Sequence, residues 1–167
     1  MSLRFNFNEE DMFPMYYPDE VEAYSEFNEA FLLHTYPRTQ NDIVEAVHKY
    51  HEIFEVGCLE AGVNLLNIIA VTIANALAHN AIEPRSLQSK LELCIEELEQ
   101  KNHSAGAFYR AISLIYGIWE NSDYGKAYEE GWMLMSKLYE EGNEFAIAMH
   151  EYAVSSQRMF EGGEKDD

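Results

Sequence analysis

The chain has 167 residues, 47% of them hydrophobic, and a formal net charge of −19. This length suits one domain, or one short array of repeats, with a substantial core. The charge excludes binding to nucleic acid through phosphate contacts, which need lysine and arginine, and it predicts repulsion from an anionic membrane. A basic protein or peptide is the natural electrostatic complement, although an acidic face that is simply solvated gives the same composition.

Residues 1–18 combine acidic and aromatic side chains, and their aromatic density argues against simple disorder. We expect this segment either to cap the first helix pair or to act as a docking arm for another chain. A single all-helical domain is expected over residues 19–160, with a polar, disordered tail at 161–167. The N-terminus lacks the layout of a signal peptide, and the longest apolar run, Leu65 to Ala78, is too short and too polar to span a bilayer. These features predict a cytoplasmic protein without a membrane segment.

Apolar residues recur at spacings of three and four along most of the chain, and strand patterns are nearly absent. Seven helices are expected, over about residues 19–36, 42–56, 60–79, 84–100, 104–119, 124–141 and 144–160. Pro18-Asp19 is expected to open the first helix and Ser104 to cap the fifth, while Asn41 or Asp42 can cap the second. The short connections predict an all-α fold of antiparallel helical hairpins, stacked as a short repeat array or closed into a compact up-down bundle.

Polar residues and cysteines interrupt the apolar helices. The expected third helix carries Asn64, Asn67, Thr72 and Asn75. Because buried amides must be hydrogen-bonded, we expect these residues to bridge neighbouring helices rather than to line a groove. Cys58 and Cys94 lie in apolar-periodic segments, which predicts buried free thiols.

Three helix ends are similar to one another. Each is acidic, continues with Gly57, Asn102 or Gly142, and then reaches small residues that open the next helix. Their spacings of about 45 and 40 residues lie within the range of helical repeats. Small residues at these points would let successive helices approach closely, as stacking requires.

The stretch from Ala107 to Ala146 carries a pattern of small, aromatic and loop residues in two successive helices. The pattern consists of Ala107, Leu114, Tyr116, Gly117, Asp123, Lys126, Ala127, Trp132, Gly142 and Ala146. This stretch resembles one unit of a Sel1-like or tetratricopeptide-type helical repeat, with a shortened loop, a lengthened second helix and Trp132 displaced by two positions. The resemblance implies a right-handed stack of helix pairs that docks protein partners on a groove, and it implies no catalytic residues.

The expected function is therefore a non-enzymatic protein–protein interaction module whose acidic surface binds a basic protein or peptide. Tyrosine and tryptophan dominate interface energetics, so the expected anchors are Tyr116, Tyr124, Tyr128 and Trp132. A homodimer is also compatible with such a surface. An alternative hypothesis is an immunity protein or nucleic-acid mimic that neutralises a basic toxin or enzyme.

A third hypothesis is a metal-dependent helical-bundle enzyme. Glu45 and His48 have the Glu-x-x-His spacing of di-iron bundles, and His51 and His150 are further candidate ligands. Such sites need a second motif of this kind, which the sequence lacks, so neither a metal nor a cofactor is expected. No nucleophile elbow, phosphate-binding loop or dinucleotide fingerprint occurs.

Overall fold

A computed structural model describes residues 4–5, 14–18, 21, 25–78, 85–115 and 124–151. Its helices are α1 (Ser25–Thr35), α2 (Gln40–Glu55), α3 (Leu59–Ala78), α4 (Arg85–Gln100), α5 (Ser104–Ile115) and α6 (Tyr124–Glu140). Residues 144–151 form a further helix, named the last helix below. Two residues of β1 (Arg4–Phe5) pair antiparallel with two of β2 (Pro14–Met15). The prediction of an all-α fold is confirmed.

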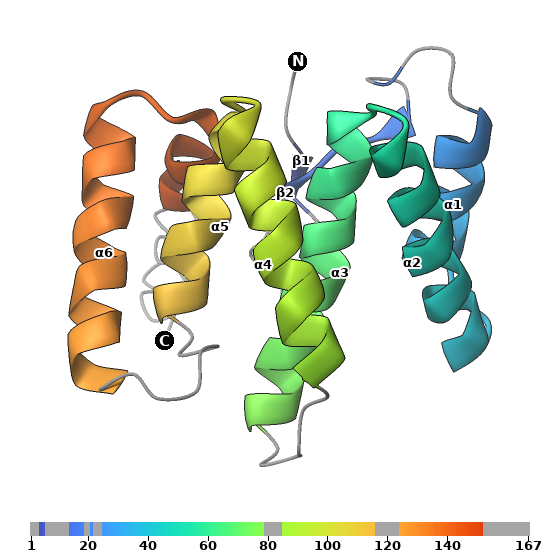
Figure 1. The fold of residues 1–167 in the computed structure, drawn as a ribbon, viewed down its shortest axis with the longest axis horizontal. Coiled ribbons are helices and arrows are strands. Elements are labelled where there is room, and N and C mark those ends of the chain that lie inside the picture. The colour runs from blue at the N-terminus through green and yellow to red at the C-terminus, as the bar shows by residue number, and fades with distance from the viewer. Residues whose placement is uncertain are drawn as a thin grey trace, which may run out of the picture.

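The helices follow one another in chain order along the longest axis of the molecule, from α1 at one end to α6 at the other (Figure 1). Each helix from α1 to α5 packs on the next one along the chain, and α3 also contacts α5. Because α1 and α6 lie at opposite ends, the helices form an open row. None of the described helices is both long enough and apolar enough to cross a membrane.

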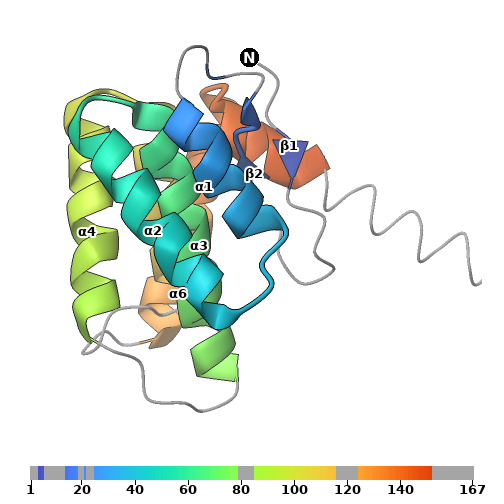
Figure 2. The same ribbon diagram turned by 90° about the vertical axis from the view of Figure 1, so that its right-hand side faces the viewer.

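α3 is the centre of the core. Every residue from Ala61 to Ala70 is buried, because this helix is apolar on nearly all sides and has neighbours on each of them. β2 contacts α3, so its residues Pro14–Met15 also belong to the packed structure. Figure 2 shows β2 and the last helix on the side of α3 opposite α4.

The three similar helix ends adopt the same turn. Gly57, Asn102 and Gly142 have φ values of 109°, 54° and 85°, in the left-handed region. In each turn the amide N–H of the following residue reaches back five positions, from Cys58 to Ile53, His103 to Leu98 and Asn143 to Leu138. This is the hydrogen-bond pattern of a Schellman motif. The predicted closing glycines at 57 and 142 are confirmed, and α2, α4 and α6 end alike.

Two glycines determine how closely α5 approaches its neighbours α4 and α6. A Cβ atom on Gly106 would lie 2.7 Å from the backbone nitrogen of Glu99, so α5 begins directly against the end of α4. A Cβ atom on Gly131 would lie 2.8 Å from the backbone nitrogen of Ile115, so the middle of α6 approaches α5 equally closely.

Two predicted starts of helices are wrong. α1 begins at Ser25 rather than at Pro18-Asp19. Instead, Pro18 accepts a hydrogen bond at its carbonyl from the amide of Val21, which closes a turn ahead of the helix. α2 has Thr39 as its N-cap, and Asp42 lies in its first turn, where the carboxylate accepts the amide hydrogen of Arg38 at 2.8 Å.

The predicted cap of the fifth helix is also different. Nδ1 of His103 accepts the backbone N–H of Ala105 at 3.1 Å, and this imidazole therefore caps α5 in place of Ser104. The Ser104 hydroxyl donates to Glu144 at 3.0 Å instead. Asn143 caps the last helix and donates from its amide to the Ser104 carbonyl, so the starts of α5 and of the last helix are tied together.

Buried polar residues link the helices, as predicted for Asn64 and Asn67. The Asn64 amide donates to the Tyr50 hydroxyl of α2 at 3.3 Å, and that hydroxyl lies 3.3 Å from Nδ1 of His34 in α1. Asn67, fully buried in α3, interacts through its side chain with His34 and with Tyr109 of α5. These five residues form the buried polar network, which connects α1, α2, α3 and α5.

Among the described side chains, the remaining polar residue of α3 does not show the predicted bridging between helices, whereas the two cysteines are as predicted. The Thr72 hydroxyl donates to the Ile68 carbonyl of its own helix, so its predicted bridging role is wrong, and the Asn75 side chain lies outside the described residues. Cys58 and Cys94 are free and buried, as predicted. Burial raises the pKa of these thiols to about 11 and about 12, which keeps both protonated at neutral pH.

Candidate interaction groove

α6 presents two different faces. Ala127, Gly131, Met135 and Leu138 follow helical spacing and are buried against the row. The rest of its surface carries four exposed large hydrophobic residues: Tyr128, Trp132 and Tyr139 flank the buried face, and Met133 lies away from it. Nine such residues occur in the described part of the chain, so nearly half of them gather on this one helix. An exposed aromatic face at the end of a row is typical of an interaction surface.

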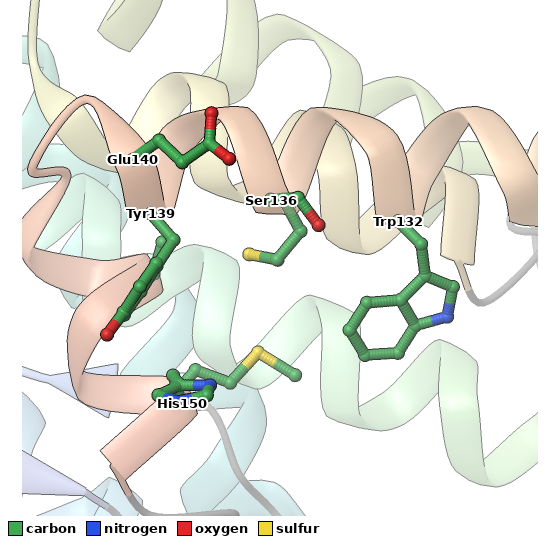
Figure 3. Close-up of a pocket in the computed structure, with 8 residues that line it drawn as sticks. Trp132, Ser136, Tyr139, Glu140 and His150 are labelled. Carbon is green, nitrogen blue, oxygen red and sulfur yellow. The ribbon is translucent and has the colours of Figure 1, made fainter.

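A groove of about 410 Å3 lies between α6 and the last helix. Its lining consists of Trp132, Met135, Ser136, Tyr139, Glu140, Ala146, Met149 and His150. Figure 3 shows Trp132 and Tyr139 projecting from α6 toward His150 of the last helix. We name this feature the α6 groove. Its surface is mostly apolar, with one carboxylate and one imidazole among the lining side chains.

Ring contacts order the aromatic side chains around the groove. The Tyr139 ring lies 4.7 Å from the His150 ring between centroids, and this contact joins α6 to the last helix. The Tyr128 and Trp132 rings meet edge to face at 6.2 Å, with Trp132 40% exposed. Such pairs restrict rotation of the side chains, which lowers the entropy lost when a ligand binds.

The charge around the groove is strongly negative. Residues 124–151 contain six glutamates and two lysines. Both lysines already lie near glutamates on the same helix, Lys126 at 3.9 Å from Glu130 and Lys137 at 3.8 Å from Glu141. Glu140, the one carboxylate in the lining, therefore lies within a segment of net negative charge, and the rest of the lining is mostly apolar.

The predicted anchors divide into two groups. Tyr128 and Trp132 lie on the outer face of α6, and Trp132 lines the groove. Tyr116 lies outside the described residues, and of Tyr124 only the backbone, at the first position of α6, is described. Sequence reasoning missed Met135 and Tyr139, although their spacing from Trp132 of three and seven residues places all three along one side of a helix.

The candidate metal ligands lie apart from the groove, with the exception of His150. Glu45 and His48 are exposed on α2, and Nε2 of His51 lies 3.0 Å from Oε1 of Glu55. Within the described ranges, no three His, Cys, Asp or Glu side chains converge in a way that could hold a metal ion.

A second groove, of about 420 Å3, lies between α2 and α4. Its lining is mixed in charge and includes Glu55, Glu96 and Glu97 together with Lys90 and Lys101. This groove therefore presents both signs of charge, whereas the lining of the α6 groove contains one carboxylate and neither lysine nor arginine.

No protein-family model, curated protein or solved structure matches this chain. The α6 groove itself therefore indicates what the chain can bind. Its apolar, aromatic lining can take up an apolar side chain, and the excess of glutamates in residues 124–151 attracts positive charge.

Proposed function

We propose that this protein is a non-enzymatic interaction module that binds a basic protein or peptide in the α6 groove. The observation that carries the proposal is an aromatic and methionine-lined groove that includes Glu140 and is formed by a segment with an excess of glutamates. The apolar lining would supply affinity, and the excess of glutamates would supply attraction and orientation. A cationic amphipathic helix, with an apolar stripe for the groove, is the partner of best fit.

The three matching turns support a related proposal, that the chain is a short array of helical repeats of the Sel1-like or tetratricopeptide type. The turns at Gly57, Asn102 and Gly142 share one hydrogen-bond pattern and recur near the expected repeat boundaries, which supports this proposal. In a partner-docking role, the aromatic residues that α6 exposes beside the last helix would be accessible to the bound protein.

A defined peptide tests the binding proposal. The probe is a fluorescent amphipathic helix of leucine and lysine, and the comparison peptide has the same leucines with glutamate in place of lysine. We expect the lysine peptide alone to bind the full chain, with an affinity that falls as salt rises, because exposed charges are screened. Fluorescence anisotropy measures the affinity for each peptide and its dependence on salt concentration.

Two variants on one helix show whether binding uses the groove. Trp132→Ala removes a lining residue, and we expect it to weaken binding about tenfold or more, as the loss of an aromatic anchor does. Met133→Ala is the matched control, because Met133 is 73% exposed and does not line the groove. Equal affinity of both variants, or binding that high salt leaves unchanged, would contradict the proposal.

A further inference from the structure

A second binding feature surrounds Asn64, far along the row from the outer face of α6. Asn64 is fully buried in α3, and its side chain holds the main chain of a single residue, Tyr16. Oδ1 accepts the Tyr16 amide hydrogen at 2.8 Å, and Nδ2 donates to the Tyr16 carbonyl at 2.9 Å. This pair of bonds satisfies both backbone groups of one extended residue, as a neighbouring strand would. It involves no side-chain atom of Tyr16.

We name the two hydrogen bonds between Asn64 and the Tyr16 main chain the clamp. Apolar contacts flank this clamp on both sides. Met15 and Tyr16 are 2% and 3% exposed. The Tyr16 ring meets the rings of Phe145 in the last helix and His103 at the start of α5, with centroids 6.2 Å and 6.3 Å away. The Tyr17 ring lies 5.1 Å from Phe31 of α1. Residues 15–17 therefore contact elements from both ends of the row. They do so on the side of α3 opposite α4, where Figure 2 shows β2.

A contact with α2 also orients the Asn64 side chain. Nδ2 of Asn64 also donates to the Tyr50 hydroxyl at 3.3 Å, so α2 helps to orient the amide. If the segment left, the amide oxygen of Asn64 would lose its bond to Tyr16 inside the core, and an unsatisfied buried acceptor is costly. The site therefore favours being filled by some extended chain.

We propose that the surface around Asn64 is a binding site for an extended peptide segment with an apolar residue followed by an aromatic one, and that residues 14–18 occupy it as an intramolecular ligand. Recognition through the backbone together with two side-chain anchors is the usual mode for extended peptides. A partner segment of the same pattern competes with residues 14–18, whose covalent link gives them a high effective concentration. This site is separate from the α6 groove and does not depend on the function proposed for it.

The test uses the full chain and a fluorescent synthetic peptide of residues 11–20, DMFPMYYPDE. The Tyr16→Ala variant weakens the intramolecular ligand, so we expect it to bind the peptide at least about tenfold more tightly than the unmodified chain does. A peptide with both M15S and Y16S, which has the same charge, should not bind. Tyr16→Phe keeps the aromatic ring and the clamp, and it should behave as the unmodified chain. A folded Tyr16→Ala variant that binds no more tightly than the unmodified chain would overturn the proposal.

Circular dichroism establishes first that the variants are folded, and Met15→Ala is the milder substitute if Tyr16→Ala unfolds. A measurement on the unmodified chain needs no variant: a peptide with a benzophenone at the position of Tyr16 should crosslink to α3 or the last helix. Crosslinks confined to other elements would refute the site. Light scattering identifies the natural source of the segment. A dimer that the peptide dissociates indicates a second copy, and a monomer that binds the peptide indicates a different protein.

Discussion

At the scale of single residues, His34 is a histidine buried in the core. It lies in the buried polar network between Tyr50 and Asn67. Burial lowers the pKa of this imidazole from 6.5 to about 4, and the hydrogen bond with Asn67 offsets part of that effect. His34 is therefore neutral in the folded protein at neutral pH, and it gives the core a polar side chain without a charge.

This arrangement predicts acid sensitivity. Below pH 6.5 the unfolded chain binds a proton at His34 while the folded chain does not, so stability falls as pH decreases toward 4. The full loss from this group is about 3 kcal/mol, and about half of it is expected between pH 7 and pH 5. Urea denaturation at several pH values measures the effect.

Two variants isolate the contribution of His34. His34→Gln should be less stable at pH 7 but should lose less stability than the unmodified chain between pH 7 and pH 5. His48→Gln, at an exposed histidine of α2, is the matched control and should keep the pH profile of the unmodified chain. An unchanged pH profile in His34→Gln would show that other groups cause the acid sensitivity.

At the scale of elements, helix contacts through glycine determine how closely the row packs. Gly106→Ala is favourable for helix propensity, but its new methyl group would meet the backbone of Glu99 at 2.7 Å. Backbone atoms of α4 cannot move aside as a flexible side chain can. We expect the clash to dominate and to cost about 1–3 kcal/mol of stability, measured by thermal or urea unfolding.

Gly125→Ala is the control for this substitution. Gly125 is exposed in the first turn of α6, so the gain in helix propensity, up to about 1 kcal/mol, should appear without a steric cost. Stabilisation of both variants would mean that α4 and α5 are not held as closely as the structure indicates.

The helices were predictable where local chemistry determines them. Gly57 and Gly142 end α2 and α6 because the left-handed turn favours glycine, and that signal is visible within a few residues. The start of α1 was not predictable, because Pro18 and Val21 close a separate turn beside a segment anchored by Asn64. Residues 16 and 64 show no local pattern that connects them.

The candidate site was predictable to a similar extent. Trp132 and Tyr128 could be selected as aromatic residues on one helical face, because helical spacing is a local property. Met149 and His150 could not be assigned to the same groove, because they come from the last helix, whose packing on α6 depends on the geometry of the turn at Gly142. Of the residues that line the groove, the sequence therefore singled out Trp132 as an anchor.

At the scale of the whole molecule, charge and shape act together. A net charge of −19 is distributed over an open row of helices, so the folded state experiences considerable self-repulsion. Added salt screens this repulsion, since the Debye length falls from about 30 Å at 0.01 M to about 8 Å at 0.15 M. We expect the melting temperature at pH 7 to rise between these two concentrations of sodium chloride.

The same comparison near pH 4.5 serves as the control, because the sequence pI is about 4.5 and the net charge there is close to zero. The increase in melting temperature with salt should largely disappear at that pH, even though the protein is less stable. A melting temperature at pH 7 that is independent of salt would show that self-repulsion contributes little to the folding free energy.

The contact between the Tyr16 and Phe145 rings has a consequence for the order of folding during synthesis. Neighbouring hairpins of the row can form as soon as each leaves the ribosome, because their contacts are local. Tyr16 must wait until Phe145 has been translated and has emerged. On a growing chain, the aromatic contacts around Asn64 thus remain incomplete until Phe145 has emerged.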